Sequence, residues 1–231
     1  MTAREDMRVI VMPTTGAAAT AAAVDISVRA RAAVADHGRF TLALSGGSTP
    51  RLMLAALGEL DMPWAQTTIF QVDERISPRG HPERNLTGLL AALGPANAAT
   101  VVEMPVEAED LAAACGEYAM RLPSVLDLVH LGLGADGHTA SLVPGDAVLQ
   151  VRDEDVALSG SYQGRRRMTL TAPRISRARA VLWLVTGEPK RPALRALLAG
   201  DRGIPAGLVH GPPQSVFCDA AALGDPSATR S

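Results

Sequence analysis

The 231 residues carry a formal net charge of -2, are 47% hydrophobic and include only 3% aromatic side chains. A chain of this length can bury one sizeable core, built here from aliphatic residues and alanine. Because no basic run is interleaved with aromatics, and because Cys115 and Cys218 lie outside any Cys/His cluster, we expect no nucleic-acid partner, disulfide framework or zinc site.

Residues 1–8 lack the charged and apolar regions of a signal peptide, and no apolar run reaches the roughly 18 residues that a membrane helix needs. We therefore expect a cytoplasmic protein that does not enter a membrane. The sequence leaves its oligomeric state open.

Apolar runs alternate with helical stretches along the chain. The apolar runs predict strands at residues 9–12, 40–44, 68–72, 126–131, 180–185 and 215–218. The helical stretches cover residues 16–37, 50–57, 85–93, 108–121 and 189–199, with Thr49 as the expected cap of the second helix. This alternation predicts an α/β fold with a mostly parallel sheet and helices on both faces. No linker divides the chain, so we expect a single domain over residues 1–231, with a frayed tail after about residue 224.

Four polar loops follow predicted strands, at residues 45–49, 73–75, 132–138 and 187–190. The carboxyl ends of parallel strands meet at one edge of a sheet, which is where ligands of such folds bind. We therefore expect the four loops to contribute to one site.

The loop from Ser45 to Thr49 joins a strand to a helix that starts with Pro50. Gly46 and Gly47 allow a ligand to approach the backbone closely, and a helix start offers free N–H groups and a partial positive charge. With the hydroxyl groups of the loop, these features favour a bound phosphate. An ordinary capped turn is the alternative, and the spacing of a nucleotide-binding P-loop is absent.

Residues 132–137 read Gly-x-Gly-x-x-Gly after a strand, which is also a dinucleotide-binding pattern. Such a site needs a helix of about three turns after the glycines, whereas Pro144 and Gly145 interrupt the chain within two turns. We therefore expect no nicotinamide cofactor, and no other cofactor is indicated.

His138 follows Asp136 and Gly137 in the same loop. The ordinary pKa of a histidine, about 6.5, allows it to take a proton from water near neutral pH. A lone histidine is often structural, but a place in a glycine-rich loop at the end of a strand favours a general base. The other histidines lack such a setting.

Charged side chains accompany these loops. Asp73, Glu74 and Arg75 end a strand, and Arg167 and Lys190 are two further cations that could bind an anion. The alternatives are a solvated charge cluster at residues 73–75 and a solvated loop for the basic run that leads to Arg167. Beside the predicted phosphate loop, the cations favour an anionic ligand.

Together, these segments resemble the glucosamine-6-phosphate deaminase/6-phosphogluconolactonase family, and its lactone-hydrolysing members in particular. In the family's order, the matching segments are residues 44–50, 73–75, 131–142 with Pro144 and Gly145, 167–171 and 187–190. The resemblance spans roughly residues 8–220, and its most specific part is the run Asp-Gly-His-Thr-Ala-Ser-Leu at 136–142. The chain departs from the family where Arg84 replaces a frequent Ser and Val143 a frequent Phe.

The resemblance implies a Rossmann-like fold shared with glucosamine-6-phosphate deaminase and ribose-5-phosphate isomerase. It implies hydrolysis of 6-phospho-D-glucono-1,5-lactone to 6-phosphogluconate, the second step of the oxidative pentose phosphate pathway, without metal or coenzyme. It places the general base at His138 and further active-site groups at Asp136, Asp73 and Arg75. The expected phosphate-binding residues are Ser45, Gly46, Gly47, Ser48, Thr49, Arg167 and Lys190.

Hydrolysis of such a lactone needs few catalytic groups. A δ-lactone is an activated ester, so one base for the water and one cation for the developing oxyanion suffice, and Arg75 is our candidate for the cation. A deaminase/isomerase acting on glucosamine 6-phosphate is an alternative, although such enzymes usually carry Asp-Glu-Tyr and His-Ile-Ala-Phe-Asn-Glu in the two loops. A non-catalytic sugar-phosphate sensor is another, although such a protein could dispense with His138.

Overall fold

The computed structural model describes residues 7–94 and 98–224. Within these ranges, the main sheet has seven strands in the order β1-β10-β9-β6-β2-β3-β5, and every neighbouring pair is parallel. The strands are β1 (Met7–Met12), β2 (Phe40–Leu44), β3 (Thr67–Gln71), β5 (Thr100–Val102), β6 (Leu128–Leu131), β9 (Val181–Val185) and β10 (Gln214–Asp219). The predicted α/β fold with a mostly parallel sheet is confirmed.

A second, antiparallel sheet extends from the carboxyl end of β3. Its order is β4-β8-β7, with β4 (Asp73–Arg75), β7 (Val156–Tyr162) and β8 (Arg165–Leu170). Val72 links the two sheets, because its N–H donates to the carbonyl of Leu44 and its carbonyl accepts from the N–H of Leu170. The small sheet therefore lies at the edge where the predicted polar loops emerge.

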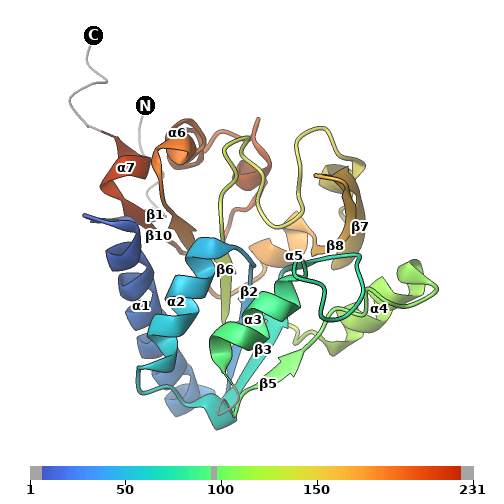
Figure 1. Ribbon diagram of the computed structural model, residues 1–231, viewed down its shortest axis with the longest axis horizontal. Helices are drawn as coiled ribbons and strands as arrows, with labels where there is room; N and C mark the ends of the chain where they lie inside the picture. The colour runs from blue at the N-terminus through green and yellow to red at the C-terminus, as the bar shows by residue number, and fades with distance from the viewer. Residues whose placement is uncertain (1–6, 95–97, 225–231) are drawn as a thin grey trace.

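Helices cover both faces of the main sheet (Figure 1). One face packs against α1 (Thr15–His37), α2 (Ser48–Gly58) and α3 (Asn85–Leu93). The other packs against α4 (Leu111–Arg121), α5 (Ala172–Ser176), α6 (Arg191–Leu198) and α7 (Ala220–Leu223). Short 3-10 turns complete the described chain: η1 (Trp64–Gln66), η2 (Ala147–Gln150), η3 (Glu188–Lys190) and η4 (Pro205–Leu208).

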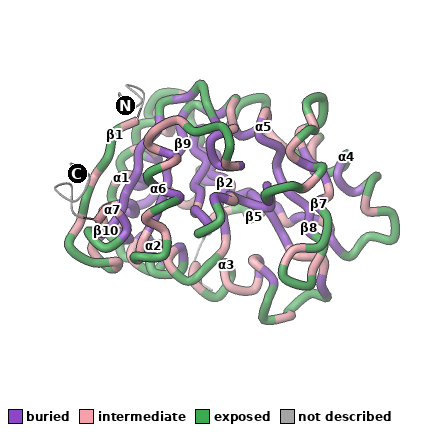
Figure 2. The backbone as a smooth tube through the Cα atoms, turned by 90° about the horizontal axis from the view of Figure 1, so that it is seen from above, coloured by how far each residue is buried: buried purple, intermediate pink, exposed green. Residues whose placement is uncertain are grey.

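Strand β9 is apolar on both faces, and its alternate side chains enter two separate cores. Leu182 and Leu184 of β9 pack with α1 and α2, whereas Val181, Trp183 and Val185 pack with the helices opposite. Figure 2 shows the result: the backbone is buried through the middle of the molecule, at β2 and β9, and exposed stretches lie around it. None of the helices in the described residues is long and apolar enough to cross a bilayer.

The structure corrects several predicted boundaries. Helix α2 begins at Ser48 with Gly47 at the capping position, so Thr49 lies inside the helix and is not its cap. Its hydroxyl group instead lies 3.0 Å from that of Thr186, which directly follows β9. Helix α4 begins only at Leu111, because the carboxylate of Asp110 caps it by accepting from two backbone N–H groups.

Other segments differ more. The predicted helix at residues 189–199 begins as the 3-10 turn η3, and the α-helix follows from Arg191. Three strands were not predicted at all: β5, β7 and β8. The segment Asp73–Arg75, predicted as a loop, is the short strand β4. The predicted frayed tail after residue 224 lies outside the described residues.

Candidate active site

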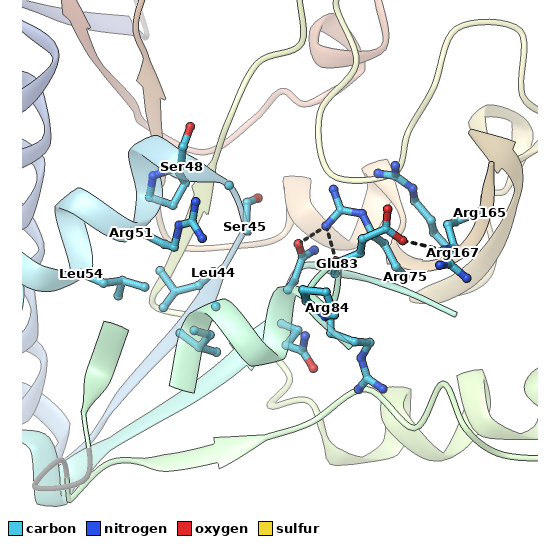
Figure 3. A pocket seen from close by; sticks show the side chains of 18 of the residues that line it. Leu44, Ser45, Ser48, Arg51, Leu54, Arg75, Glu83, Arg84, Arg165 and Arg167 are labelled. Atoms are coloured by element: carbon cyan, nitrogen blue, oxygen red, sulfur yellow. Dashed lines mark hydrogen bonds and ion pairs between the residues drawn. The ribbon is translucent and has the colours of Figure 1, made fainter. Parts of the chain in front are cut away.

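Two adjoining cavities lie at the carboxyl ends of the central strands. The first, of about 250 Å³, contains His138 and Lys190 in its lining and is called here the histidine cavity. The second, of about 300 Å³, contains Arg51 and Arg165 and is called the arginine cavity. They share the loop after β2, and Figure 3 shows the arginine cavity, with α2 on one side and the arginines of the small sheet on the other.

The predicted site residues converge on the histidine cavity. All of them except Asp136 contribute to its lining: Ser45, Gly46, Gly47, Ser48, Thr49, Asp73, Arg75, His138, Arg167 and Lys190. Asp136 lies directly behind the lining, in contact with His138. The four polar loops thus meet at one place, as the strand order requires.

The centre of the site is a carboxylate–imidazole pair. Nδ1 of His138 lies 2.6 Å from Oδ1 of Asp136, and the backbone N–H of His138 donates to the same oxygen at 3.2 Å. The two side chains are 24% and 37% exposed, and that of His138 lines the cavity. A tight turn joins them, closed by the bond from the N–H of Gly137 to the carbonyl of Gly134.

The pair defines which imidazole nitrogen is available. Burial alone would raise the pKa of Asp136, but its hydrogen bonds with His138 and with the hydroxyl group of Tyr162 lower the pKa overall. An ionised Asp136 accepts the Nδ1–H of His138, which leaves the Nε2 lone pair free. The geometry therefore suits an imidazole that accepts a proton at Nε2.

Gly134 makes this close approach possible. A Cβ atom at this position would lie 2.0 Å from Nδ1 of His138 and 2.4 Å from Oδ1 of Asp136. Such distances are far below van der Waals contact, so any larger residue would push the pair apart. In this chain, the glycine pattern after β6 makes room for the pair, and the stretch from Gly132 to Gly145 forms turns without an α-helix.

Asp73 connects the small sheet to the loop that carries the histidine. Its side chain is buried and accepts hydrogen bonds from the hydroxyl group of Ser141, at 2.6 Å, and from the amide of Asn85, at 3.1 Å. Burial raises its pKa, against the opposing effects of the Ser141 hydrogen bond and the charge of Arg167. Asp73 thereby connects β4 with the loop that contains Ser141 and with the start of α3 at Asn85.

Arg75 is held in a fixed direction. Its Nη1 donates to the carbonyl of Glu83 at 2.8 Å and to Oδ1 of Asn85 at 2.7 Å. Asn85 in turn packs against the loop after β2, where a Cβ on Gly46 would lie 2.0 Å from the Asn85 Oδ1 atom. Gly46 is therefore required for the contact that orients Arg75.

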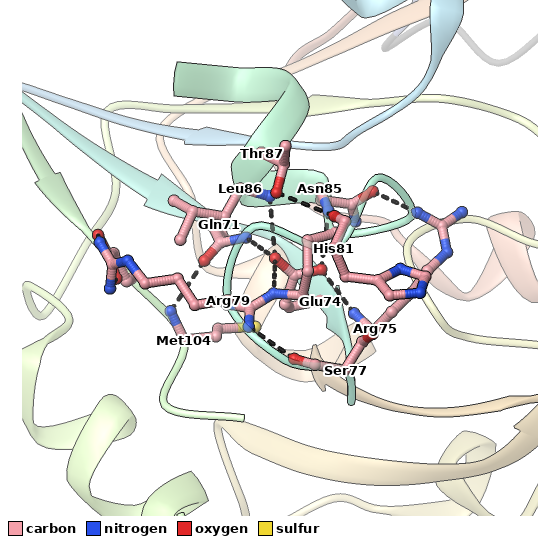
Figure 4. A network of polar contacts seen from close by, with 12 residues as sticks. Gln71, Glu74, Arg75, Ser77, Arg79, His81, Asn85, Leu86, Thr87 and Met104 are labelled. Carbon is pink, nitrogen blue, oxygen red and sulfur yellow. Dashed lines mark hydrogen bonds and ion pairs between the residues drawn. The ribbon is translucent and has the colours of Figure 1, made fainter. Parts of the chain in front are cut away.

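A buried network centred on Glu74 lies next to Arg75 (Figure 4). Its fully buried carboxylate accepts from the side chain of Gln71 and from the backbone N–H groups of Arg75, Asn85 and Leu86. Arg84, the residue that departs from the family pattern, forms an ion pair with Glu74 at 2.9 Å. This network fixes the chain between β4 and α3.

The predicted phosphate loop leads into α2 without a side-chain cap. Gly47 has a φ of 129°, a conformation that favours glycine, and it precedes the free N–H groups at the helix start. The ammonium group of Lys190 makes no ion pair with any described residue, and Nε of Arg167 is buried without a hydrogen-bond partner among them. The free ammonium group of Lys190 and the unpartnered Nε of Arg167 thus line the same cavity as a helix start, an arrangement that suits an anion.

Several residues at the site were not predicted. Tyr162 donates from its hydroxyl group to Oδ2 of Asp136 at 3.0 Å, and Ser141 and Asn85 hold Asp73. Ser141 and Asn85 lie in segments that the sequence did single out, but Tyr162 lies in a hairpin that gave no signal. The described residues contain no cluster of three or more His, Cys, Asp or Glu side chains arranged to hold a metal ion.

Comparisons with known proteins identify the family of the chain. The model of the family described as glucosamine-6-phosphate isomerases/6-phosphogluconolactonase matches residues 13–217. The 6-phosphogluconolactonase of a Nostoc species is 37% identical over 72% of this chain and 75% of its own length. That of a Synechocystis species is also 37% identical, over 78% of this chain and 80% of its own length.

Solved structures show the same fold. A 6-phosphogluconolactonase from Shewanella baltica superimposes with a TM-score of 0.85 at 24% identity, covering 95% of this chain and 100% of its own. A monomeric glucosamine-6-phosphate deaminase reaches a TM-score of 0.82 at 20% identity, covering 94% and 98%. The match of the family model, together with the relatives at 37% identity, shows that this chain belongs to the glucosamine-6-phosphate isomerase/6-phosphogluconolactonase family.

Proposed function

We propose that this chain is a 6-phosphogluconolactonase: it hydrolyses 6-phospho-D-glucono-1,5-lactone to 6-phosphogluconate, in the second step of the oxidative pentose phosphate pathway. The observation that carries the proposal is the open Asp136–His138 pair in the same cavity as a helix start and the cation Lys190. The pair supplies a base, and the helix start and Lys190 supply a site for the phosphate. The names of the curated relatives support the same substrate.

In the proposed reaction, Nε2 of His138 takes a proton from a water molecule as the water oxygen adds to C1 of the lactone. The carbonyl oxygen becomes an oxyanion in the tetrahedral intermediate. The bond between C1 and the ring oxygen then breaks, and the proton held by His138 passes to the departing ring oxygen. The product is the open-chain acid, which ionises to a carboxylate.

Asp136 supports this step without touching the substrate. Its carboxylate accepts from Nδ1 of His138, holds the imidazole in the tautomer with Nε2 free, and stabilises the imidazolium as it forms. Its lowered pKa keeps it ionised at neutral pH.

The oxyanion and the phosphate need separate cations. We retain Arg75 as the group for the oxyanion, because its bonds to Glu83 and Asn85 fix its direction before the substrate binds. We assign the phosphate to the start of α2 with Lys190 and Arg167, whose cationic groups are less occupied. Phosphate binding then positions C1 against the water beside His138.

Two assays on the purified chain test the proposal. Proton release from fresh 6-phosphogluconolactone should exceed the spontaneous rate, and ammonia release from glucosamine 6-phosphate should stay at background. Ammonia release without lactone hydrolysis would identify a deaminase. Binding of the sugar phosphate with neither reaction would identify a sensor.

A further inference from the structure

Tyr162 joins the proposed base from a different part of the fold. Its hydroxyl group donates to Oδ2 of Asp136 at 3.0 Å and lies 3.3 Å from Nδ1 of His138. The imidazole occupies the other carboxylate oxygen, Oδ1, at 2.6 Å. Both oxygens of Asp136 are therefore engaged, and the carboxylate cannot rotate away from the imidazole without breaking the Tyr162 bond.

The ring of Tyr162 makes a second contact, with a cation. The guanidinium carbon of Arg167 lies 5.0 Å from the ring centroid, within the range of a cation–π interaction. Arg167 also donates to the backbone carbonyl of Tyr162 and to the side chain of Gln163, each at 3.3 Å. One face of the aromatic ring is thus directed at Arg167, the proposed phosphate-binding cation, and the hydroxyl group contacts the Asp136–His138 pair.

A shift in strand register brings Tyr162 to this position. Ser159 of β7 pairs with Arg167 of β8, so a regular ladder would place Ser161 opposite Arg165, but Tyr162 occupies that place. Side chains alternate between the faces of a sheet, so one extra residue in β7 moves Tyr162 onto the face that carries Arg167. The carboxylate of Asp146 accepts from the N–H of Gly160 at 2.8 Å, within the irregular stretch.

The hairpin turn that follows is also specific. Its two residues, Gln163 and Gly164, have φ angles of 53° and 78°. Positive φ at both central positions is the property of the tight turns that match the twist of a hairpin. The turn and the register shift together fix Tyr162 between the Asp136–His138 pair and Arg167.

Resting on the proposed lactonase function, we infer that Tyr162 is a positioning residue that couples the base to the phosphate-binding cation. Its hydroxyl group holds Asp136 against His138, and its ring holds Arg167 at the cavity. The hydroxyl group and the ring can be removed one after the other, so their effects on the base and on phosphate binding can be measured separately.

The hydroxyl group also shares the charge of Asp136 with the imidazole. The charged or titratable groups that face it are Asp136 and His138 from the loop after β6 and Arg167 from β8. By donating to Asp136, Tyr162 withdraws part of the negative charge that stabilises the imidazolium. Removal of the hydroxyl group therefore favours the protonated, inactive form of His138.

Tyr162→Phe removes the hydroxyl group and keeps the ring. We expect kcat on 6-phosphogluconolactone to fall by roughly 3- to 30-fold, because the variant loses one charge-assisted hydrogen bond. KM should stay unchanged. The acid limb of the pH profile of kcat should move to higher pH by about half a unit. Unchanged kcat, or an acid limb that stays in place, would overturn the role of the hydroxyl group.

Tyr162→Leu removes the ring as well. We expect KM for the phosphorylated lactone to rise by about 2- to 10-fold over the Phe variant, and KM for glucono-δ-lactone, which lacks the phosphate, to stay the same. An equal rise of KM on both lactones would contradict the coupling to the phosphate.

The matched control is Tyr118→Phe, because Tyr118 is the other tyrosine of the chain and its buried hydroxyl group bonds only to backbone atoms in the described residues. This variant should lower Tm and leave the acid limb in place. An equal shift of the acid limb in both variants would mean that the shift reflects a general loss of stability and not the loss of the Tyr162 hydroxyl group.

NMR titration of the His138 ring in the substrate-free chain separates this inference from the proposed function. Tyr162→Phe should move the midpoint to higher pH whether or not the chain is a lactonase. A wild-type chain that hydrolyses no lactone but shows this shift would overturn the proposed function alone. A lactonase without the shift would overturn the inference alone.

Discussion

Two carboxylates of this molecule, Glu74 and Asp136, pair with nitrogen-bearing side chains in opposite surroundings. Glu74 and Arg84 meet at 2.9 Å, and their side chains are 0% and 2% exposed. Asp136 and His138 meet at 2.6 Å, but they are 37% and 24% exposed, and His138 lines the histidine cavity. The carboxylate of Glu74 is surrounded by N–H donors, whereas the second pair leaves one imidazole nitrogen free.

The difference shows how one fold assigns two roles to similar chemistry. Glu74 is sealed by backbone N–H groups from both ends of the β4–α3 connection, so its charge fixes the chain that carries Arg75. Asp136 is bonded mainly to the residue it serves, so its charge acts on the reactivity of His138. The sealed pair builds the site, and the open pair is proposed to perform the reaction.

The largest expected effect follows from removing the open pair's base. His138→Ala should lower kcat on 6-phosphogluconolactone by roughly 10²- to 10⁴-fold, the usual contribution of a positioned general base. The fold should persist, because the side chain lies in a partly exposed loop. The control is His210→Ala, which removes an exposed histidine outside both cavities. A folded His138→Ala chain with near-normal kcat would remove this residue from the mechanism.

Substitution in the buried Glu74–Arg84 pair should mainly lower the free energy of unfolding. Glu74→Gln places an amide N–H₂ group among N–H donors, and it leaves the buried Arg84 with only its longer ion pair to Glu107, at 3.8 Å. We expect the free energy of unfolding to fall by about 2–4 kcal/mol, measured by urea denaturation. A variant as stable as the wild type would show that the network contributes nothing to holding the β4–α3 connection.

The phosphate site should show an intermediate effect. Lys190→Ala should lower kcat/KM on 6-phosphogluconolactone by about 10- to 100-fold, because a charge-assisted contact contributes about 1.5–3 kcal/mol. On glucono-δ-lactone, the variant and the wild type should be almost equally poor. Arg195→Ala, an exposed cation further along the same segment, is the control. An equal loss on both lactones would mean that Lys190 acts in the chemistry or in folding.

The smallest effect concerns a second histidine, His130, which lies in β6, the strand that precedes the loop of His138. His130 is fully buried, neither ring nitrogen has a partner among the described residues, and burial lowers its pKa to about 3. Between that value and the ordinary value of about 6.5, the unfolded chain binds a proton that the folded chain rejects, so stability falls as pH falls.

His130→Leu should therefore lose less stability on acidification than the wild type, while its free energy of unfolding at neutral pH changes by only about 1 kcal/mol. Denaturant unfolding at several pH values measures this. Identical acid dependence in the variant and the wild type would show that His130 does not contribute to acid unfolding.

Much of the main sheet could be predicted because its strands are apolar runs separated by helices, which local patterns report directly. The small sheet could not. Strand β8 begins with three arginines and β4 is a run of three charged residues, so neither has the alternation that marks a strand. Their strand character comes from pairing with each other and with β7, a contact between distant parts of the chain.

The same limit applies to the site. His138 and the glycine-rich loops could be predicted because each motif is contiguous and follows a strand. Tyr162 could not, because its place depends on a one-residue register shift and on a contact across 24 positions of sequence. The role of Gly134 was also hidden, since only the folded loop shows that a Cβ would collide with the Asp136–His138 pair.

The most direct test of the account is the pH profile of kcat/KM for 6-phosphogluconolactone in the wild type and in Asp136→Asn. The wild-type profile should have an acid limb, because the protonated imidazole of His138 cannot act as a base. In the variant, the imidazolium loses its counter-charge, so the acid limb should move to lower pH while kcat falls through loss of the held tautomer. An unchanged acid limb and an unchanged kcat in a folded Asp136→Asn chain would contradict the claim that the open pair performs the reaction.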